Sequence, residues 1–479
     1  YDYDSSSVGF YDVSTNDAMI LTYWRLCYAG INRANKLLES IDRPAIDETV
    51  RTRIESEARF LRAYFHFMLV NRFQNIPIML QSPKDGYKES VQIAQSAPRD
   101  TYQMIISEME ASVAGLPNAE TLSGGGHLSQ SAAYGILARV ALYMAGEPLK
   151  ETTMYAKAKE YAGKVIELGF HRLNPSFEEV FINMIQDKYD IRETIFEIEF
   201  WGNNQSTYTA TAGQIGRING IQAYTALTNI GPSNGALRAS SYFYTLYEEG
   251  DLRRDWTIMP YMYKNEAVLE QILYNEPFRF RWPGKFRREY EINLPVYSWG
   301  NSTNYPLLRY SDVLLMFAEA DNMVNNGSTP ESLEAVNQVR RRAFGFDPLT
   351  PLPEVDMKAM SQTEFLEYIQ AERARELAFE SHRRLDLMRW GIFLDRMHEI
   401  GEELAAIPLK VIDEGTGKSV DNPIFTQSGS GFPMNSNPSG PEMMARPFRN
   451  VDQKHLLMPI PELEMSVNKA IDTNNPGWN

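Results

Sequence analysis

The position of helical periodicity along the chain constrains its fold more than any other feature. Apolar side chains recur at helical spacing in segments on both sides of a central stretch. These segments are residues 18–41, 49–73, 99–116, 129–145, 153–168, 309–325, 329–344 and 361–404. Residues 174–306 lack this spacing, although 194–201 alternates like a strand and 240–249 is compatible with a helix. The pattern predicts a mostly α-helical protein with a loop-rich middle containing a few short strands.

Small residues recur at a fixed distance in the two helical parts. Ala141 precedes Ala158 by seventeen residues, and Ala318 precedes Ala335 by the same seventeen. Small side chains at such spacing let two antiparallel helices pack closely, as in tetratricopeptide pairs. Two unrelated helical hairpins would give the same spacing, and both interpretations stay open at this point.

Charge and motifs exclude several functional classes. The 47 Lys and Arg against 62 Asp and Glu give a net charge of −15, which disfavours nucleic acid and anionic lipid as partners. The single cysteine, Cys27, allows no disulfide within the chain and lies in an apolar helical pattern, which predicts a buried thiol. No metalloprotease or phosphate-binding motif occurs, and we expect neither a metal nor a cofactor.

The densest run of charges is residues 372–390. A glycoside hydrolase would need two carboxylates facing each other across a cleft, about 5–10 Å apart. Glu376 and Glu380 are four residues apart, so a helix places both on one side of a turn. Glu380 and Arg384 have the spacing of an ion pair on a helix surface. The run therefore predicts a structural ion network rather than a catalytic pair.

Aromatic residues cluster in the middle of the chain. The cluster contains Trp282, Phe286, Tyr290, Tyr297, Trp299 and Tyr305, together with Asn301 and Asn304. Sugars present apolar CH faces that stack on rings and hydroxyl groups that bond to amides. Any single aromatic ring is most often part of a hydrophobic core. We do not expect the whole group to be buried, because the stretch is polar and has few aliphatic residues. We expect Trp299 and Tyr297 to bind a glycan, then Trp282 and Tyr305, with the two asparagines at the rim.

The first residues have a similar composition. Phe10, Tyr11 and Asp12 are candidates for loop residues at the same kind of site. A poorly ordered terminus explains them equally well.

Five motifs in order resemble the SusD/RagB family. They are residues 28–38, residues 57–67 with 72–77, residues 309–320 with 336–340, residues 372–390, and residues 455–461 with 475–478. The ending departs from the family pattern, with Asn474 in place of the usual glutamine and Asn468-Lys469 in place of Asn-Pro. The resemblance implies a scaffold of tetratricopeptide-like helix pairs that carries a large loop-rich insertion. The expected parts are residues 1–173 and 307–479, packed as one scaffold, and a ligand-facing insertion at 174–306.

The resemblance also implies a function. Members of this family capture oligosaccharides without catalysis and deliver them to a SusC-like TonB-dependent barrel. They are tethered to the outer face of the bacterial outer membrane through a lipidated N-terminal cysteine, a role that Cys27 does not fit. A peptide-binding (RagB-type) or purely structural transporter subunit remains the alternative, and a glycoside hydrolase a remote one.

Overall fold

The computed structural model describes residues 11–84, 88–201, 212–221, 223, 230–235, 237–259, 261–263, 271–273, 282–293, 296, 300–406, 408, 410–413, 415–421 and 447–478. The chain divides into two compact units. Unit 1 comprises Tyr1–Gly115, Gly146–Glu151 and Arg384–Asn479, and unit 2 comprises Leu116–Ala145 and Thr152–Arg383.

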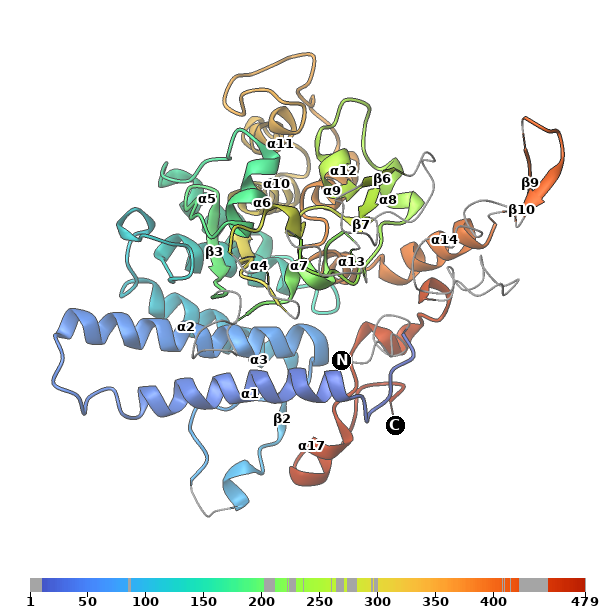
Figure 1. Ribbon diagram of the computed structural model, residues 1–479. Helices are drawn as coiled ribbons and strands as arrows, with labels where there is room; N and C mark the ends of the chain where they lie inside the picture. Colours follow the sequence, from blue (N-terminus) through green and yellow to red (C-terminus); the bar gives the residue numbers. More distant parts are fainter. Residues whose placement is uncertain are drawn as a thin grey trace. The chain divides into compact units, whose positions relative to one another are not determined.

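Three helices form the N-terminal part of unit 1 (Figure 1). They are α1 (Ala18–Leu38), α2 (Glu48–Phe73) and α3 (Pro98–Val113), and α2 packs against both of the others. The Asp17 carboxylate accepts the N–H groups of Met19 and Ile20 and so caps α1, because the first N–H groups of a helix have no partner within it. Gly30 lies against the ring of Phe65, where a Cβ would collide, so α1 and α2 approach closely.

The C-terminal part of unit 1 contains shorter elements. They are α13 (Arg383–Arg389, whose first residue belongs to unit 2), α14 (Phe393–Ala405), β9 (Lys410–Ile412), β10 (Ser419–Asp421) and α17 (Glu462–Val467). The Asn475 amide donates to the backbone carbonyls of Phe73 and Met458, at 2.9 and 2.7 Å. The Asn475 side chain therefore connects the last family motif, residues 455–461 and 475–478, to the end of α2.

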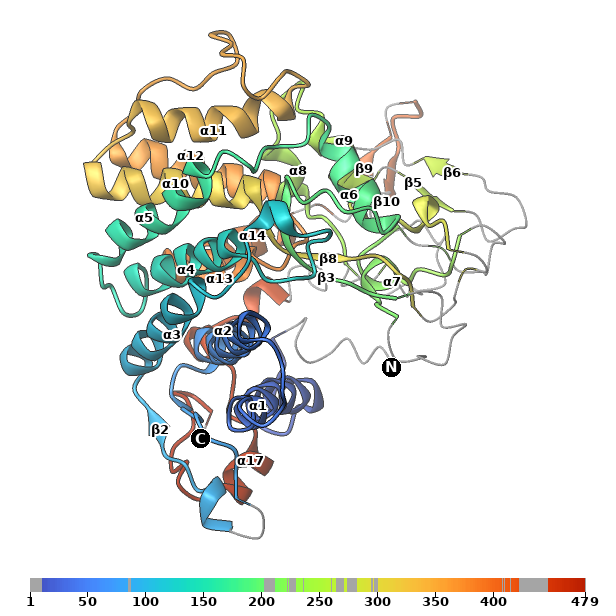
Figure 2. The same cartoon turned by 90° about the vertical axis from the view of Figure 1, so that its left-hand side faces the viewer.

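A layer of paired helices forms the scaffold of unit 2 (Figure 2). It contains α4 (Gln130–Ala145), α5 (Met154–Glu167), α10 (Tyr310–Asn325), α11 (Pro330–Ala343) and α12 (Gln362–Glu376). The helix α4 packs on α5, α5 on α10, and α10 on both α11 and α12. Ala141, Ala158, Ala318 and Ala335 are all buried within these helices. The predicted tetratricopeptide-like pairs are confirmed, because α4 packs on α5 and α10 packs on α11, and each of these helices carries one of the buried alanines.

The remainder of unit 2 consists of short elements. The helices are α6 (Phe177–Ile185), α7 (Ile215–Ile218), α8 (Ser241–Thr245) and α9 (Arg253–Thr257). The antiparallel strand pairs are β3 (Thr194–Ile198) with β8 (Tyr305–Arg309), β4 (Ile258–Met259) with β7 (Trp282–Pro283), and β5 (Tyr261–Tyr263) with β6 (Gln271–Leu273). In unit 1, β1 (Ile76–Pro77) pairs with β2 (Gln95–Ser96) and β9 with β10.

The structure corrects some element predictions. The helix predicted over 361–404 is three helices, because Phe379 and Ser381 have φ values of 63° and 62° and Gly391 has 75°. The strand predicted over 194–201 ends at Ile198, and the helix predicted over 240–249 spans only Ser241–Thr245. The helix α6 and the strand β8 were not predicted.

The predicted fold class is confirmed: a helical scaffold carries loop-rich chain with short strands. None of the helices in the described ranges has the length and hydropathy of a membrane-spanning segment. The division at residues 173 and 306 stays a prediction.

Candidate functional site

A buried ion cluster in unit 2 connects the middle of the chain to α12. Arg309, at the end of β8, donates to the carboxylates of Glu193, Glu376 and Glu380 over 2.8–2.9 Å. Arg342 of α11 also bonds Glu193 and Glu376, at 3.1 and 2.7 Å. Because these side chains are fully buried, each charge depends on its partners for the solvation that water would supply.

Besides Glu193, the same cluster holds three further residues of the predicted insertion. Arg253 bonds Asp251 at 2.7 Å and Glu372 at 2.7 Å, and the Lys285 ammonium bonds Glu380 at 2.7 Å. The pairs therefore fix residues 251–253 and residue 285 to α12 and the turn after it.

The prediction of an ion network in residues 372–390 is confirmed, with one correction. Burial alone would raise the pKa of Glu376, but Arg342, Arg309 and other cations lower it well below the ordinary range. Glu376 and Glu380 are buried and ion-paired, so they do not face a cleft as an acid and base. Glu380 pairs with Lys285 and Arg309 and not with Arg384, because α12 ends at Glu376 and the spacing of a helix does not apply.

Residues 284–288 extend from this cluster toward the aromatic stretch. The Arg287 guanidinium lies 3.6 Å from the centre of the Trp256 ring and donates to the Trp256 carbonyl at 2.6 Å. Phe286 is fully buried against Phe181 of α6, with ring centres 5.7 Å apart. Residues 286 and 287, which directly follow Lys285, are therefore closely packed, one against Phe181 and the other against Trp256.

Arg288 holds three pieces of chain together. Its guanidinium bonds the Glu291 carboxylate at 2.6 and 3.0 Å, a paired geometry that fixes both side chains. It also donates to the carbonyls of Pro232 at 2.8 Å and Gly300 at 3.1 Å. A Cβ on Gly231 would collide with this guanidinium, so glycine at 231 allows the close approach.

Both ends of the stretch 293–302 lie next to the residues that Arg288 holds together. The Asn293 amide donates to the Ser302 hydroxyl at 2.7 Å, and the Asn301 amide donates to Glu291 at 3.1 Å and Thr303 at 2.8 Å. Asn301 also exchanges backbone hydrogen bonds with Gly213, both at 2.8 Å. We call residues 293–302 the aromatic loop, because it carries Tyr297 and Trp299, and we call the bonds at its two ends the loop base.

Three of the residues predicted to contact a ligand are buried in contact with protein. Trp282 is 1% exposed in β7, with the Arg238 guanidinium 4.7 Å from its ring centre, so too little of the ring is accessible to stack on a sugar. Asn301 is buried in the loop base, and the Asn304 side-chain Oδ1 accepts the Phe200 N–H at 3.1 Å. In the structure the ring faces or polar atoms of these side chains contact protein, and their contacts with a ligand stay predictions.

The remaining predicted residues have different outcomes. Tyr305 is partly buried against Phe286, with ring centres 6.2 Å apart. Tyr11 belongs to unit 1 and packs on His455 and Phe393, with ring centres 5.5 and 6.1 Å away; burial raises its pKa. Asp12 follows it with an exposed side chain. Phe10, Tyr297 and Trp299 lie outside the described residues, so their roles stay predictions.

Sequence reasoning missed one exposed ring next to the loop base. Trp201 is 66% exposed and follows Phe200, whose ring lies 2.7 Å from where a Cβ on Gly213 would be. Since Gly213 pairs with Asn301, Trp201 follows a residue in contact with the loop base. The polar run that begins at Gly202 was the available signal that the strand ends at a surface. Among the described residues, no three acidic, histidine or cysteine side chains form an arrangement that could hold a metal ion.

Comparison with known proteins gives the family. The SusD family model matches residues 192–478, and a model described as starch-binding and associating with the outer membrane matches residues 3–142. SusD-like protein P2 of Formosa agariphila is 27% identical over 403 residues, which are 80% of this chain and 74% of that protein.

Solved structures share the fold over nearly the whole chain. A SusD homologue from Bacteroides thetaiotaomicron is 26% identical with a TM-score of 0.84, over 98% of this chain and 88% of its own. A laminarin-binding SusD-like protein is 21% identical with a TM-score of 0.68, over 95% of this chain and 86% of its own. The protein described here therefore belongs to the SusD family.

Proposed function

We propose that this protein captures glycans at the bacterial cell surface through its aromatic loop and does not catalyse a reaction on them. The observation that carries the proposal is the loop base: Arg288, Asn293 and Asn301 hold both ends of a loop that contains Tyr297 and Trp299. Tyr and Trp rings stack on the apolar faces of sugars, which is the contact that the proposal assigns to these two residues.

Trp201 extends the proposed surface. Its exposed ring follows Phe200, which contacts Asn304 and the position of Gly213 next to the loop base. Stacking surfaces on two segments would contact successive sugar units of one chain, which raises affinity without any single strong contact.

The relatives support the choice of ligand class. One related structure is a laminarin-binding protein, and laminarin is a polysaccharide. The family description associates such proteins with the outer membrane. The proposal extends to a lipid anchor on the outer face of that membrane and to delivery of the glycan to a SusC-like TonB-dependent transporter.

A peptide ligand is the second candidate, and the burial of Trp282 favours it. A glycan platform needs accessible ring faces, and this ring is packed inside the protein. A peptide would use backbone edges and charged pockets instead. A hydrolase has no support from Glu376 and Glu380, which are buried in the ion cluster.

The test is a native affinity-gel screen against plant, host and microbial polysaccharides, followed by calorimetry on each hit. The proposal expects retardation by one class of glycan and no new reducing ends after prolonged incubation. Binding of peptides but of no glycan would replace it with the second candidate. Release of shortened glycan by the pure protein would contradict the absence of catalysis.

A further inference from the structure

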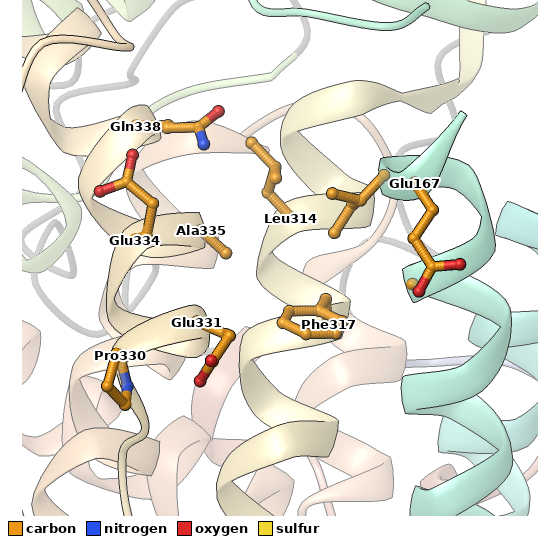
Figure 3. A pocket seen from close by; sticks show the side chains of 10 residues that line it. Glu167, Leu314, Phe317, Pro330, Glu331, Glu334, Ala335 and Gln338 are labelled. Carbon is orange, nitrogen blue, oxygen red and sulfur yellow. The ribbon is translucent and has the colours of Figure 1, made fainter. Parts of the chain in front are cut away.

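A groove in unit 2 lies on helices that the proposed glycan site does not use (Figure 3). It has a volume of about 420 Å³ and is bounded by α5, α10 and α11. Leu314 and Phe317 of α10 form the floor, between α5 and α11. Ile166 of α5 and Ala335 of α11 also line the groove. The volume falls within the range of about 300–1,000 Å³ that is usual for ligand sites, so several side-chain groups would fit.

Gly163 keeps this groove open. It lies inside α5, where glycine makes a helix less stable than alanine does. A Cβ at this position would lie 3.8 Å from Phe317 Cε2 and 3.9 Å from Glu167 Oε1, which is ordinary contact. A side chain would therefore fit here, and its absence leaves the apolar floor accessible.

The rim of the groove is acidic on both sides. Glu167 lies on the α5 side, and Glu331 and Glu334 lie on the α11 side. Glu334 is neutralised by Arg341, which bonds it at 2.9 Å. Glu167 and Glu331 make no ion pair with any side chain in the part of the chain that the structure describes, and none of the lining residues is a lysine or arginine. A negative rim around an apolar floor selects a cationic, partly apolar partner.

We propose that the groove binds a segment of another protein that presents an apolar side chain flanked by lysine or arginine. The apolar side chain would lose water against the partly exposed Phe317 and Ile166, and the flanking cations would pair with Glu167 and Glu331 across the groove. An amphipathic helix has this arrangement at its i, i+3 and i+4 positions. This protein contact is separate from glycan capture, so the two can be tested independently.

The probe is a fluorescein-labelled helical peptide of leucine and lysine, with a matched peptide of leucine and glutamate. Fluorescence anisotropy at low salt should show binding of the lysine peptide and not of the glutamate peptide. Gly163→Leu should weaken binding at least about tenfold, because its side chain fills the groove. The double variant Glu167→Gln/Glu331→Gln should weaken binding about fivefold and flatten its dependence on salt.

Two variants serve as controls. Gly163→Ala adds only a Cβ and should retain most of the binding. Glu403→Gln/Glu462→Gln removes the same charge from exposed positions elsewhere in the chain and should leave binding unchanged. Thermal unfolding checks that each variant is folded, and the glutamine variants keep the test decisive if Gly163→Leu is not.

Four results would overturn the proposal. The lysine peptide could fail to bind, a folded Gly163→Leu could bind it as well as the wild type, or the control double variant could lose as much affinity as the rim variant. A photo-crosslinking version of the peptide should attach to α5, α10 or α11, and attachment only outside these helices would equally refute the proposal.

Discussion

Replacing Arg309 with methionine is expected to destabilise unit 2 strongly. The buried cluster contains five cations and five carboxylates among the described residues, so its charges balance. These residues are Arg253, Lys285, Arg309, Arg342, Arg375, Glu193, Asp251, Glu372, Glu376 and Glu380. Methionine keeps much of the volume but leaves one negative charge without compensation. Breaking a buried pair in this way costs about 3–5 kcal/mol.

The geometry supports the upper part of that range. Arg309 donates to three carboxylates and to the Glu376 carbonyl, and all of these acceptors lose a partner at once. Protonating one glutamate would restore the balance of charge, so the loss should be smaller at pH 5 than at pH 8. The reason is that the folded variant would bind a proton that its unfolded chain releases as the pH rises.

Calorimetry and hydrogen exchange measure this effect. Exchange in residues 362–376 reports on unit 2 directly, which matters because a chain of two units need not unfold in one step. Arg254→Met is the control: it breaks a partly exposed pair with Asp255 and should cost below about 1 kcal/mol. The reasoning is refuted if Arg309→Met destabilises unit 2 no more than Arg254→Met does.

Three further predictions follow from local geometry. Gly231→Ala should weaken glycan binding in calorimetry without touching ligand, because its Cβ would displace the Arg288 guanidinium from the loop base; unchanged affinity would mean that the base does not position the loop. Glu197→Gln should raise the melting temperature at pH 8 but not at pH 4.5. Burial and then the charge of Glu199 and two aspartates raise the pKa of Glu197 to about 8 from 4.5, so stability falls as the pH rises between these values, and equal effects at both pH values would contradict this. Gly163→Ala should stabilise unit 2 by about 0.5–1 kcal/mol in thermal unfolding, and a loss of stability would show that the groove has no room for a side chain.

The long helices could be predicted from sequence because their apolar spacing is a local property. Where the prediction of one helix over 361–404 was wrong, the cause is long-range. The chain turns at Phe379 and Ser381 with positive φ values, and Glu380 in that turn bonds Arg309 and Lys285 from distant segments. The sequence around Glu380 does not indicate that this carboxylate will form ion pairs with Lys285 and Arg309, which are distant in the chain.

The candidate site was only partly accessible to sequence reasoning, for the same reason. Composition located the aromatic stretch, but burial of Trp282 depends on the pairing of β7 with β4 and on Arg238. The asparagine at 301 was identified as important, yet its partners Glu291 and Thr303 make it part of the loop base. Residue type alone does not distinguish an amide that binds sugar from one that holds a loop.

The most direct test of glycan capture by the aromatic loop is a calorimetric titration of the glycan that binds in the screen. Trp299→Ala and Tyr297→Ala should each raise Kd about tenfold, equivalent to about 1.4 kcal/mol. Phe346→Ala, which removes another exposed ring of unit 2, should leave Kd unchanged. If both loop variants bind the glycan as tightly as the wild type, and Phe346→Ala also leaves Kd unchanged, the aromatic loop is not the site and the account is wrong.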